Sequence, residues 1–184
     1  KSLAVDRDGY VYVADTGNNR VEKFTSDGTF VTKWGLVGYG PGQFVSPDGI
    51  AVDAQGNVFV AENYTYRIQK FTSTGTWLGE WGERGSADGQ FGFVVRVATD
   101  PQGNVYAVDN GNYRIQAFDN NGAFKTKWGS AGQLPGQLDN PIGIAVDANG
   151  NIFVADTNNS RIQKFAALTT PTRLVSWGRV KALY

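Results

Sequence analysis

Four pairs of an acidic residue and an arginine are the side chains in this sequence best suited to a catalytic role. In each pair the acid stands five positions before the arginine: Asp15 with Arg20, Glu62 with Arg67, Asp109 with Arg114 and Asp156 with Arg161. A catalytic pair is needed once per active site, whereas this pair recurs. Arginine offers a planar fork of donors that can bind a carboxylate and loop carbonyls together. The repetition therefore predicts structural clasps, each bridging the ends of one loop, and not a catalytic centre.

A second repeated series of acids could bind a metal ion: Asp6, Asp53, Asp100 and Asp147, spaced by 47 residues. Each opens a short glycine-bearing turn, and the first of these, "DRDG", resembles the start of a calcium-binding loop. The ligand run that ends in glutamate is missing. An aspartate in this position commonly accepts hydrogen bonds from backbone N–H groups of its own turn. We therefore predict turn caps, with a metal site as the alternative.

The composition excludes several kinds of active site and partner. The 184 residues include no histidine and no cysteine, so a Ser-His-Asp triad, histidine acid–base catalysis and histidine or thiolate metal sites are excluded. Seventeen basic and seventeen acidic residues give a net charge of zero, so the chain has no excess of basic residues to neutralise a phosphate backbone. No apolar run approaches the roughly 20 residues that span a bilayer. We expect no cofactor, no nucleic-acid partner and no membrane span.

A repeat of 47 residues must position these groups. Trp34, Trp81 and Trp128 keep this interval, while Trp177 comes two residues late, which places an insertion in "AALTTPTR". Each unit has four apolar-rich runs separated by turns, in the second copy "GIAVD", "NVFVAE", "RIQKF" and "WLGEWG". Alternation with a period of two is typical of strands, and glycine-bearing turns such as "DAQGN" are typical of hairpins. The unit is predicted to be a four-stranded antiparallel sheet, and such sheets must pack on one another to cover their faces.

The repeat resembles the NHL family. "SPDGIAVDAQGNVFVAENYTYRIQKF" and "NPIGIAVDANGNIFVADTNNSRIQKF" are similar to NHL repeats, which read Pro-x-Gly-Ile-Ala-Val-Asp, then Gly-Asn-Val-Tyr-Val-Ala-Asp, then Asn-x-Arg-Ile. The resemblance implies an all-β fold, a β-propeller of four-stranded antiparallel blades, with "GIAVD" innermost and a strand ending in "KWG" outermost. It implies a single domain over residues 1–184, with blades at about 1–35, 48–82, 95–129 and 142–178. The tryptophans are then expected between blades, together with the repeated Phe24, Phe71, Phe118 and Phe165.

Four blades raise the question of how the ring closes. NHL propellers usually have six blades, and at about 60° per blade four would leave a gap of about 120° with two apolar sheet faces exposed. A rotation of about 90° per blade would close a ring of four around a narrower channel. The uniform repeat does not fix the angle, and the insertion in the last copy lies in an outer hairpin. We expect this chain to be part of a larger assembly, either a segment of a longer propeller or an arc completed by another chain.

Departures from the repeat gather in loops that share one face of the propeller, here named the loop face. This face carries the loops between second and third strands and the loops between blades. The second copy has "ENYTYR" and the third "DNGNYR" where the first has "DTGNNR", and Arg96 stands where other blades have Gly49 and Gly143. Because tyrosine and arginine are enriched in binding hot spots, the candidate ligand-binding residues are Glu62, Asn63, Tyr64, Tyr66, Phe93, Arg96 and Tyr113. The alternative is drift between repeats, with tyrosines covering loop backbone and Arg96 paired with Glu62.

These observations predict a non-enzymatic module that binds a protein, peptide or glycan with its loop face, and that also associates with itself or with other propeller segments. Partner binding is the usual role implied by the NHL resemblance, and related propeller lyases depend on histidines that this sequence lacks. Two alternatives stay open: a metal-assisted lactonase or lyase with oxygen ligands, and a structural unit of a surface array. The absence of cysteine and the loops rich in glycine, asparagine and threonine suggest an extracellular or cell-surface protein.

Overall fold

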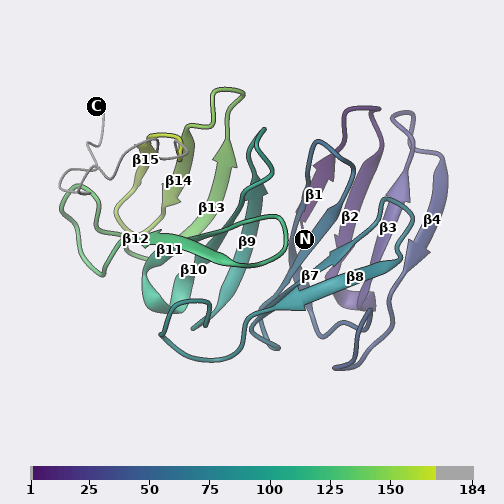
Figure 1. The fold of residues 1–184 in the computed structure, drawn as a ribbon, viewed down its shortest axis with the longest axis horizontal. Coiled ribbons are helices and arrows are strands. Elements are labelled where there is room, and N and C mark those ends of the chain that lie inside the picture. Colours follow the sequence, from purple (N-terminus) through teal and green to yellow (C-terminus); the bar gives the residue numbers. More distant parts are fainter. Residues whose placement is uncertain (1, 169–184) are drawn as a thin grey trace.

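The structure, a computed structural model, describes residues 2–168 and consists of antiparallel sheets arranged as the four blades of a propeller (Figure 1). The predicted all-β class and blade architecture are confirmed. No helix formed within residues 2–168 is long and apolar enough to cross a membrane. Trp177 lies outside the described residues, as do most of the segment "AALTTPTR" and the predicted end of the fourth blade.

Each sheet keeps its strands in chain order, from an inner strand beside the centre to an outer one. Blade 1 consists of β1 (Ser2–Val5), β2 (Val11–Asp15), β3 (Arg20–Phe24) and β4 (Phe30–Trp34). Blade 2 consists of β5 (Pro47–Val52), β6 (Val58–Glu62), β7 (Arg67–Phe71) and β8 (Trp77–Trp81). Blade 3 consists of β9 (Val94–Thr99), β10 (Val105–Asp109), β11 (Arg114–Phe118) and β12 (Phe124–Trp128). The described strands of blade 4 are β13 (Pro141–Val146), β14 (Ile152–Asp156) and β15 (Arg161–Phe165). Short 3-10 helices, η1 (Thr16–Asn18) and η2 (Asn110–Asn112), precede β3 and β11.

Among the described residues, three hydrophobic clusters join successive blades: one between blades 1 and 2, one between 2 and 3, and one between 3 and 4. Side chains alternate along a strand, so each blade has a preceding face, toward the blade before it in the chain, and a following face. In β6, Val58 and Val60 pack against blade 1, whereas Phe59 and Ala61 pack against blade 3. All four are fully buried, which explains why this strand is apolar on both sides.

Aromatic rings from neighbouring blades interlock at the outer part of each interface. A tryptophan of the fourth strand packs against a phenylalanine in the third strand of the next blade. The ring centroids lie 6.0, 5.8 and 5.6 Å apart in Trp34–Phe71, Trp81–Phe118 and Trp128–Phe165. The predicted position of these residues between blades is confirmed. Within residues 2–168, Phe24 contacts no tryptophan of another blade, and its ring lies 5.9 Å from that of Phe30 in its own sheet.

Blades 1 and 4 each present one apolar face that packs against no other blade within residues 2–168. On the preceding face of blade 1, Leu3 and Val5 are 63% and 56% exposed. On the following face of blade 4, Ile162 is 65% exposed. Their counterparts inside the interfaces, Ile50 and Ile68, are 4% and 0% exposed. The described blades therefore form an arc held by three interfaces, with an open apolar face at either end.

Candidate functional site

The acid–arginine pairs fasten the loops between blades to the sheets. In blade 3, Arg114 Nε donates to Asp109 Oδ2 at 2.7 Å, and the side chain of Asp109 is completely buried. The two Nη atoms of Arg114 donate to the backbone carbonyls of Ser86, Ala87 and Gln90 at 2.8–2.9 Å. The guanidinium thus binds the loop that precedes its blade as well as the carboxylate. With these donors engaged inside the fold, the pair is not available to a substrate.

A glutamine completes the clasp in blades 2, 3 and 4. In blade 3, Gln116 Nε2 donates to the carbonyl of Gln90 at 2.7 Å, while its Oε1 accepts from the backbone N–H of Gly89 at 3.0 Å. Gln69 and Gln163 make the equivalent bonds in their blades. This residue was missed at the sequence level, although its signal was present in the recurring tripeptide "RIQ".

Blade 1 contains a different version of the clasp. Arg20 Nε donates to Asp15 at 2.8 Å, and its Nη2 pairs with Glu22 at 2.8 Å, in the position that glutamine occupies elsewhere. The side chain of Arg20 is 29% exposed, compared with 7% for Arg114. The guanidinium in blade 1 therefore binds two carboxylates, whereas the guanidinium in blade 3 binds one carboxylate and three loop carbonyls.

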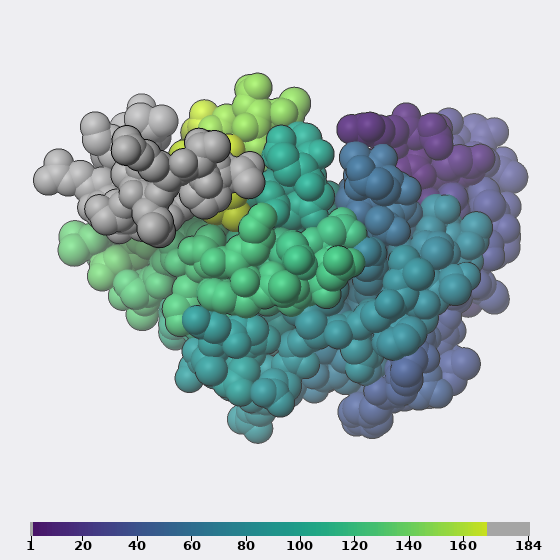
Figure 2. All heavy atoms as spheres, in the orientation of Figure 1, coloured from purple at the N-terminus to yellow at the C-terminus, as the bar shows by residue number. Residues whose placement is uncertain are grey.

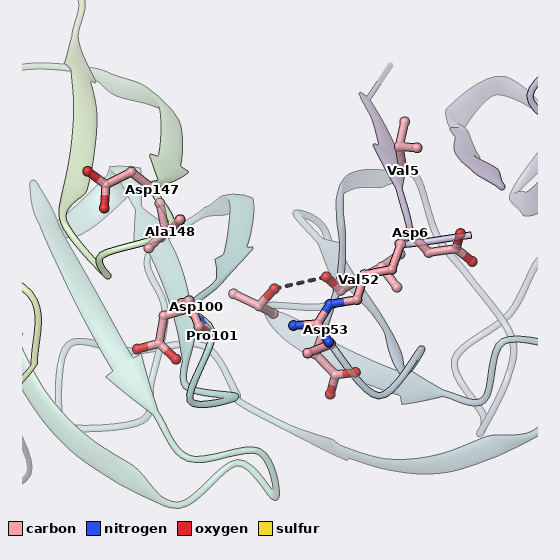
Figure 3. Close-up of a pocket in the computed structure, with 12 residues that line it drawn as sticks. Val5, Asp6, Val52, Asp53, Asp100, Pro101, Asp147 and Ala148 are labelled. Atoms are coloured by element: carbon pink, nitrogen blue, oxygen red, sulfur yellow. Dashed lines mark hydrogen bonds between the residues drawn. The ribbon is translucent and has the colours of Figure 1, made fainter. Parts of the chain in front are cut away.

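The repeated aspartates cap their own turns at the opposite end of the blades, the turn face. In blade 3, Asp100 Oδ1 accepts from the backbone N–H groups of Gln102 and Asn104, and its Oδ2 accepts from the side chains of Asn104 and Tyr106. The hydrogen bonds confirm the predicted turn caps. Figure 3 shows four carboxylates pointing away from the cavity between the turns: those of Asp6, Asp53, Asp100 and Asp147. No group of three or more carboxylate side chains within residues 2–168 is arranged to hold a metal ion.

The cavity between the turns, of about 200 Å³, opens at the turn face. Figure 2 shows the hollow between the first turn of blade 3 (teal) and those of blades 1 and 2 (purple and blue). Its walls are the ends of the inner strands, including Val5, Val52 and Val146. Thr99 Oγ1 on β9 donates a hydrogen bond to the carbonyl of Val52 on β5 at 2.9 Å, which links two of these strands (Figure 3). Since the carboxylates face outward, the cavity wall offers aliphatic groups, backbone and the side chain of Arg7 in place of a catalytic acid.

The loop face carries exposed aromatic residues on the loops of blades 2 and 3. Tyr66 and Phe93 stack with ring centroids 5.9 Å apart, and Arg84 lies over the Tyr66 ring at 5.6 Å. Tyr64, Phe93 and Tyr113 are 66%, 45% and 40% exposed. We name these five residues the aromatic patch. Arg84 was not among the residues that the sequence pointed to, since an arginine in a variable loop carries no spacing signal.

Two tyrosines of the aromatic patch have a backbone conformation that tyrosine rarely adopts. Tyr66 and Tyr113 have φ values of 57° and 55°, in the left-handed region. The same position in blades 1 and 4 is occupied by Asn19 and Ser160, with φ values of 53° and 52°. A bulky residue in this region costs on the order of 1 kcal/mol, and such strain tends to gather at functional sites. The loop geometry therefore does not account for the choice of tyrosine, although Tyr66 also packs against the hydrophobic cluster between blades 2 and 3.

The structure separates three of the candidate residues from the aromatic patch. Glu62 is fully buried in its clasp, where it accepts from Arg67 Nε at 2.8 Å, so it does not contribute to an exposed surface. Asn63, next to it, is partly exposed, but its Oδ1 atom is buried and has no hydrogen-bond partner within residues 2–168. Arg96 pairs with Asp48, at 3.1 Å, and donates to the carbonyl of Val95 at 2.7 Å. The alternative pairing of Arg96 with Glu62 is therefore wrong, because Glu62 is already neutralised by its own arginine.

Comparison with protein families identifies the repeat. The NHL repeat family matches residues 1–24, 44–71 and 138–165. These segments end with the third strand of blades 1, 2 and 4. The corresponding part of blade 3 is not among the matches, in agreement with the departures seen in its sequence. No curated protein sequence gives a significant match.

Solved structures with the same arrangement of blades include enzymes. A streptogramin B lyase matches with a TM-score of 0.63 and 19% identity, over 91% of this chain and 54% of its own. Virginiamycin B lyase from Staphylococcus aureus matches with a TM-score of 0.64 and 18% identity, over 91% and 55%. Hydrazine synthase from Kuenenia stuttgartiensis matches with a TM-score of 0.66 and 10% identity, over 89% and 45%. The chain spans about half the length of these proteins, and at such identities the likeness shows the fold alone.

Proposed function

Because this chain is an NHL-repeat β-propeller, we propose that it is a non-enzymatic module that binds a protein, peptide or glycan through its loop face. The observation that carries the proposal is the aromatic patch, in which two tyrosines adopt a strained backbone and Arg84 covers one of them. Exposed aromatic rings provide a large contact area at low entropic cost, and tyrosine and arginine dominate binding hot spots.

The position of the aromatic patch supports this proposal. The patch lies where the family pattern breaks, at the junction of blades 2 and 3. Phe93 stands beside Gly111 of the neighbouring loop so closely that a β-carbon there would lie 2.9 Å from its ring. This contact and the stacking on Tyr66 hold the Phe93 ring in place, although 45% of the residue is exposed. A ring fixed before binding loses little conformational freedom when a ligand covers it.

The choice of binding over catalysis rests on the chemistry of the side chains. The described structural neighbours include lyases, but histidine is absent from this sequence. The repeated carboxylates are engaged in clasps and turn caps. The alternative, a metal-assisted lactonase or lyase, would be favoured by one equivalent of a tightly bound divalent ion in elemental analysis of the purified protein. As part of the proposal, we place the module outside the cell or at its surface.

The proposal is tested by selecting a ligand and then removing single rings. The purified chain is screened on a glycan array and against a displayed peptide library, and the strongest binder is titrated by biolayer interferometry. We expect Tyr64→Ala and Phe93→Ala each to weaken binding by roughly 10- to 30-fold, the effect of losing a hot-spot residue. Arg96→Ala reports whether the patch extends toward the inner strands.

Phe30→Ala is the matched control, since Phe30 is 51% exposed but lies on the outer strand β4, away from the loop face. Its affinity should equal that of the unmodified chain. Unchanged affinity in Tyr64→Ala, Phe93→Ala and Tyr113→Ala, with folding intact by circular dichroism, would contradict the assignment of the loop face.

A further inference from the structure

The two open faces of the arc carry the two halves of an interface that the chain already makes three times. The following face of blade 1 presents Tyr12, Ala14 and Val21, which pack against the preceding face of blade 2. One repeat period of 47 residues separates equivalent positions. The following face of blade 4 therefore presents the counterparts of these three residues, Phe153, Ala155 and Ile162.

The preceding face of blade 1 matches the other half. In blade 2 this half consists of Ile50, Val58, Val60 and Phe71, all at most 4% exposed. The counterparts in blade 1 are apolar at every position: Leu3, Val11, Val13 and Phe24. Leu3 is 63% exposed, and the other three are only partly buried. An apolar face of this kind is a surface for association.

A hydrogen bond from a lysine to the third turn of the next blade occurs at two interfaces, and the residues equivalent to its donor and acceptor are present at the two open faces. Lys23 of blade 1 donates to the carbonyl of Ser73 in the third turn of blade 2, at 3.3 Å, and Lys70 of blade 2 donates to Asn120 in the same turn of blade 3. The equivalent lysine of blade 4 is Lys164, and the equivalent turn residue of blade 1 is Ser26. Lys164 now lies over the Phe153 ring of its own blade at 5.5 Å.

The two open faces correspond to different halves of the internal interfaces, so a contact of the same kind between them is head-to-tail. We propose that two copies of this chain associate in this way, with the following face of blade 4 in each packing against the preceding face of blade 1 in the other. Such heterologous contacts form a closed ring when the rotations add up to a full turn. Two copies give a ring of eight blades, within the roughly 4–8 blades of known propellers, whereas three copies would exceed it.

Sedimentation velocity on the full chain across about 1–100 μM tests the proposal. We expect a species of twice the chain mass of 19.9 kDa. Leu3→Glu and Ile162→Glu should each raise the dissociation constant by at least tenfold, because each places a charge in both contacts of the ring. Both positions are more than 60% exposed in the isolated chain, so the variants should fold. Leu36→Glu is the control, at a residue that is 59% exposed in the loop after β4 and outside both faces.

Mixing the variants distinguishes a head-to-tail contact from a symmetric one. A mixture of Leu3→Glu and Ile162→Glu chains contains one intact contact, between blade 4 of the first and blade 1 of the second, so dimers should reappear in the mixture. An unmodified chain that stays at 19.9 kDa at every concentration would overturn the proposal. Sensitivity to only one of the two substitutions would do the same, as would an unlimited series of larger species.

Discussion

Blades 1 and 3 contain the same acid–arginine pair in different surroundings. In blade 3 the guanidinium of Arg114 binds a fully buried carboxylate and three carbonyls of the preceding loop. In blade 1 the guanidinium of Arg20 binds two partly exposed carboxylates. In blade 3 the pair therefore joins neighbouring blades. Its contribution to stability depends on the loop of the preceding blade that lies beside it.

The largest effect is expected from removing the buried guanidinium. Arg114→Ala would leave Asp109 buried without its cation and would remove three hydrogen bonds to carbonyls of the preceding loop. Breaking a buried ion pair in this way typically costs about 3–5 kcal/mol. Urea denaturation followed by tryptophan fluorescence measures the loss.

Arg20→Ala is the matched variant in blade 1, where exposed pairs contribute about 0–1 kcal/mol. Equal losses in the two variants would show that the loop carbonyls add nothing and that the comparison between the blades is wrong.

A second contrast concerns the glycine in the turn between third and fourth strands. Gly122 has a φ of +87°, and a β-carbon there would lie 2.6 Å from the Trp81 ring of the preceding blade. Gly28 has the same φ of +87°, but a β-carbon there would meet nothing within 4 Å. Both alanine variants suffer left-handed strain of about 1–2 kcal/mol, and Gly122→Ala adds about 1–3 kcal/mol for displacing the ring. In thermal unfolding, Gly122→Ala should therefore have a clearly lower melting temperature than Gly28→Ala. The reverse order would contradict the packing of Gly122 against the Trp81 ring.

Exchanging glutamine and glutamate at the third position of the clasp should destabilise blade 3 more than blade 1. Gln116→Glu places a second carboxylate beside Asp109 and removes the donor to the carbonyl of Gln90, now at 2.7 Å. This carbonyl keeps Arg114 Nη2 as a donor, so the cost comes from the lost hydrogen bond and from two carboxylates placed side by side, about 1–3 kcal/mol. Protonation of the new carboxyl restores a donor, so the loss should shrink as the pH is lowered.

The reciprocal change, Glu22→Gln, gives blade 1 the residue of the other blades and removes one exposed ion pair, which is worth about 0–1 kcal/mol. Denaturation at pH 7 compares the two. A Glu22→Gln loss as large as that of Gln116→Glu would contradict the asymmetry.

The smallest effect is a pH dependence in blade 1. The side chain of Asn18, together with Arg20, lowers the pKa of Asp15, although partial burial opposes the shift. A pKa that is lower in the folded state than its value of about 3.9 in the unfolded chain means stabilisation that is present above about pH 4 and lost as the pH falls through the folded pKa. Asp15→Asn should therefore unfold at a lower temperature than the unmodified chain at pH 7 and at the same temperature near pH 2. A constant difference across this range would contradict the shift.

Much of the fold can be predicted from the sequence, because the same pattern of apolar and turn residues occurs in each copy of the repeat. Alternating apolar residues such as those of "NVFVAE" predicted β6, and its burial on both faces follows from the neighbouring blades. The turn-capping aspartates were also predicted, since the interaction is local: Asp53 binds N–H groups two and four residues away.

The candidate site was only partly readable. Tyr64, Tyr66, Phe93 and Tyr113 were found as departures from the repeat, and the structure places them on neighbouring loops of blades 2 and 3. The contribution of Arg84 and the internal pairing of Arg96 with Asp48 depend on contacts between blades. Such contacts depend on the rotation angle between neighbouring sheets, which a local sequence pattern does not predict.

Periodicity, turn residues and composition predict the blades, their strand order and the catalytic side chains that are absent. The burial of one copy of a repeated motif and the exposure of another, like the open faces, depend on how the blades pack. Asp15 and Asp109 stand in the same motif, yet one is 22% exposed and the other completely enclosed. The physical reason is that burial belongs to a residue's neighbours in space, and those neighbours come from the blade on either side.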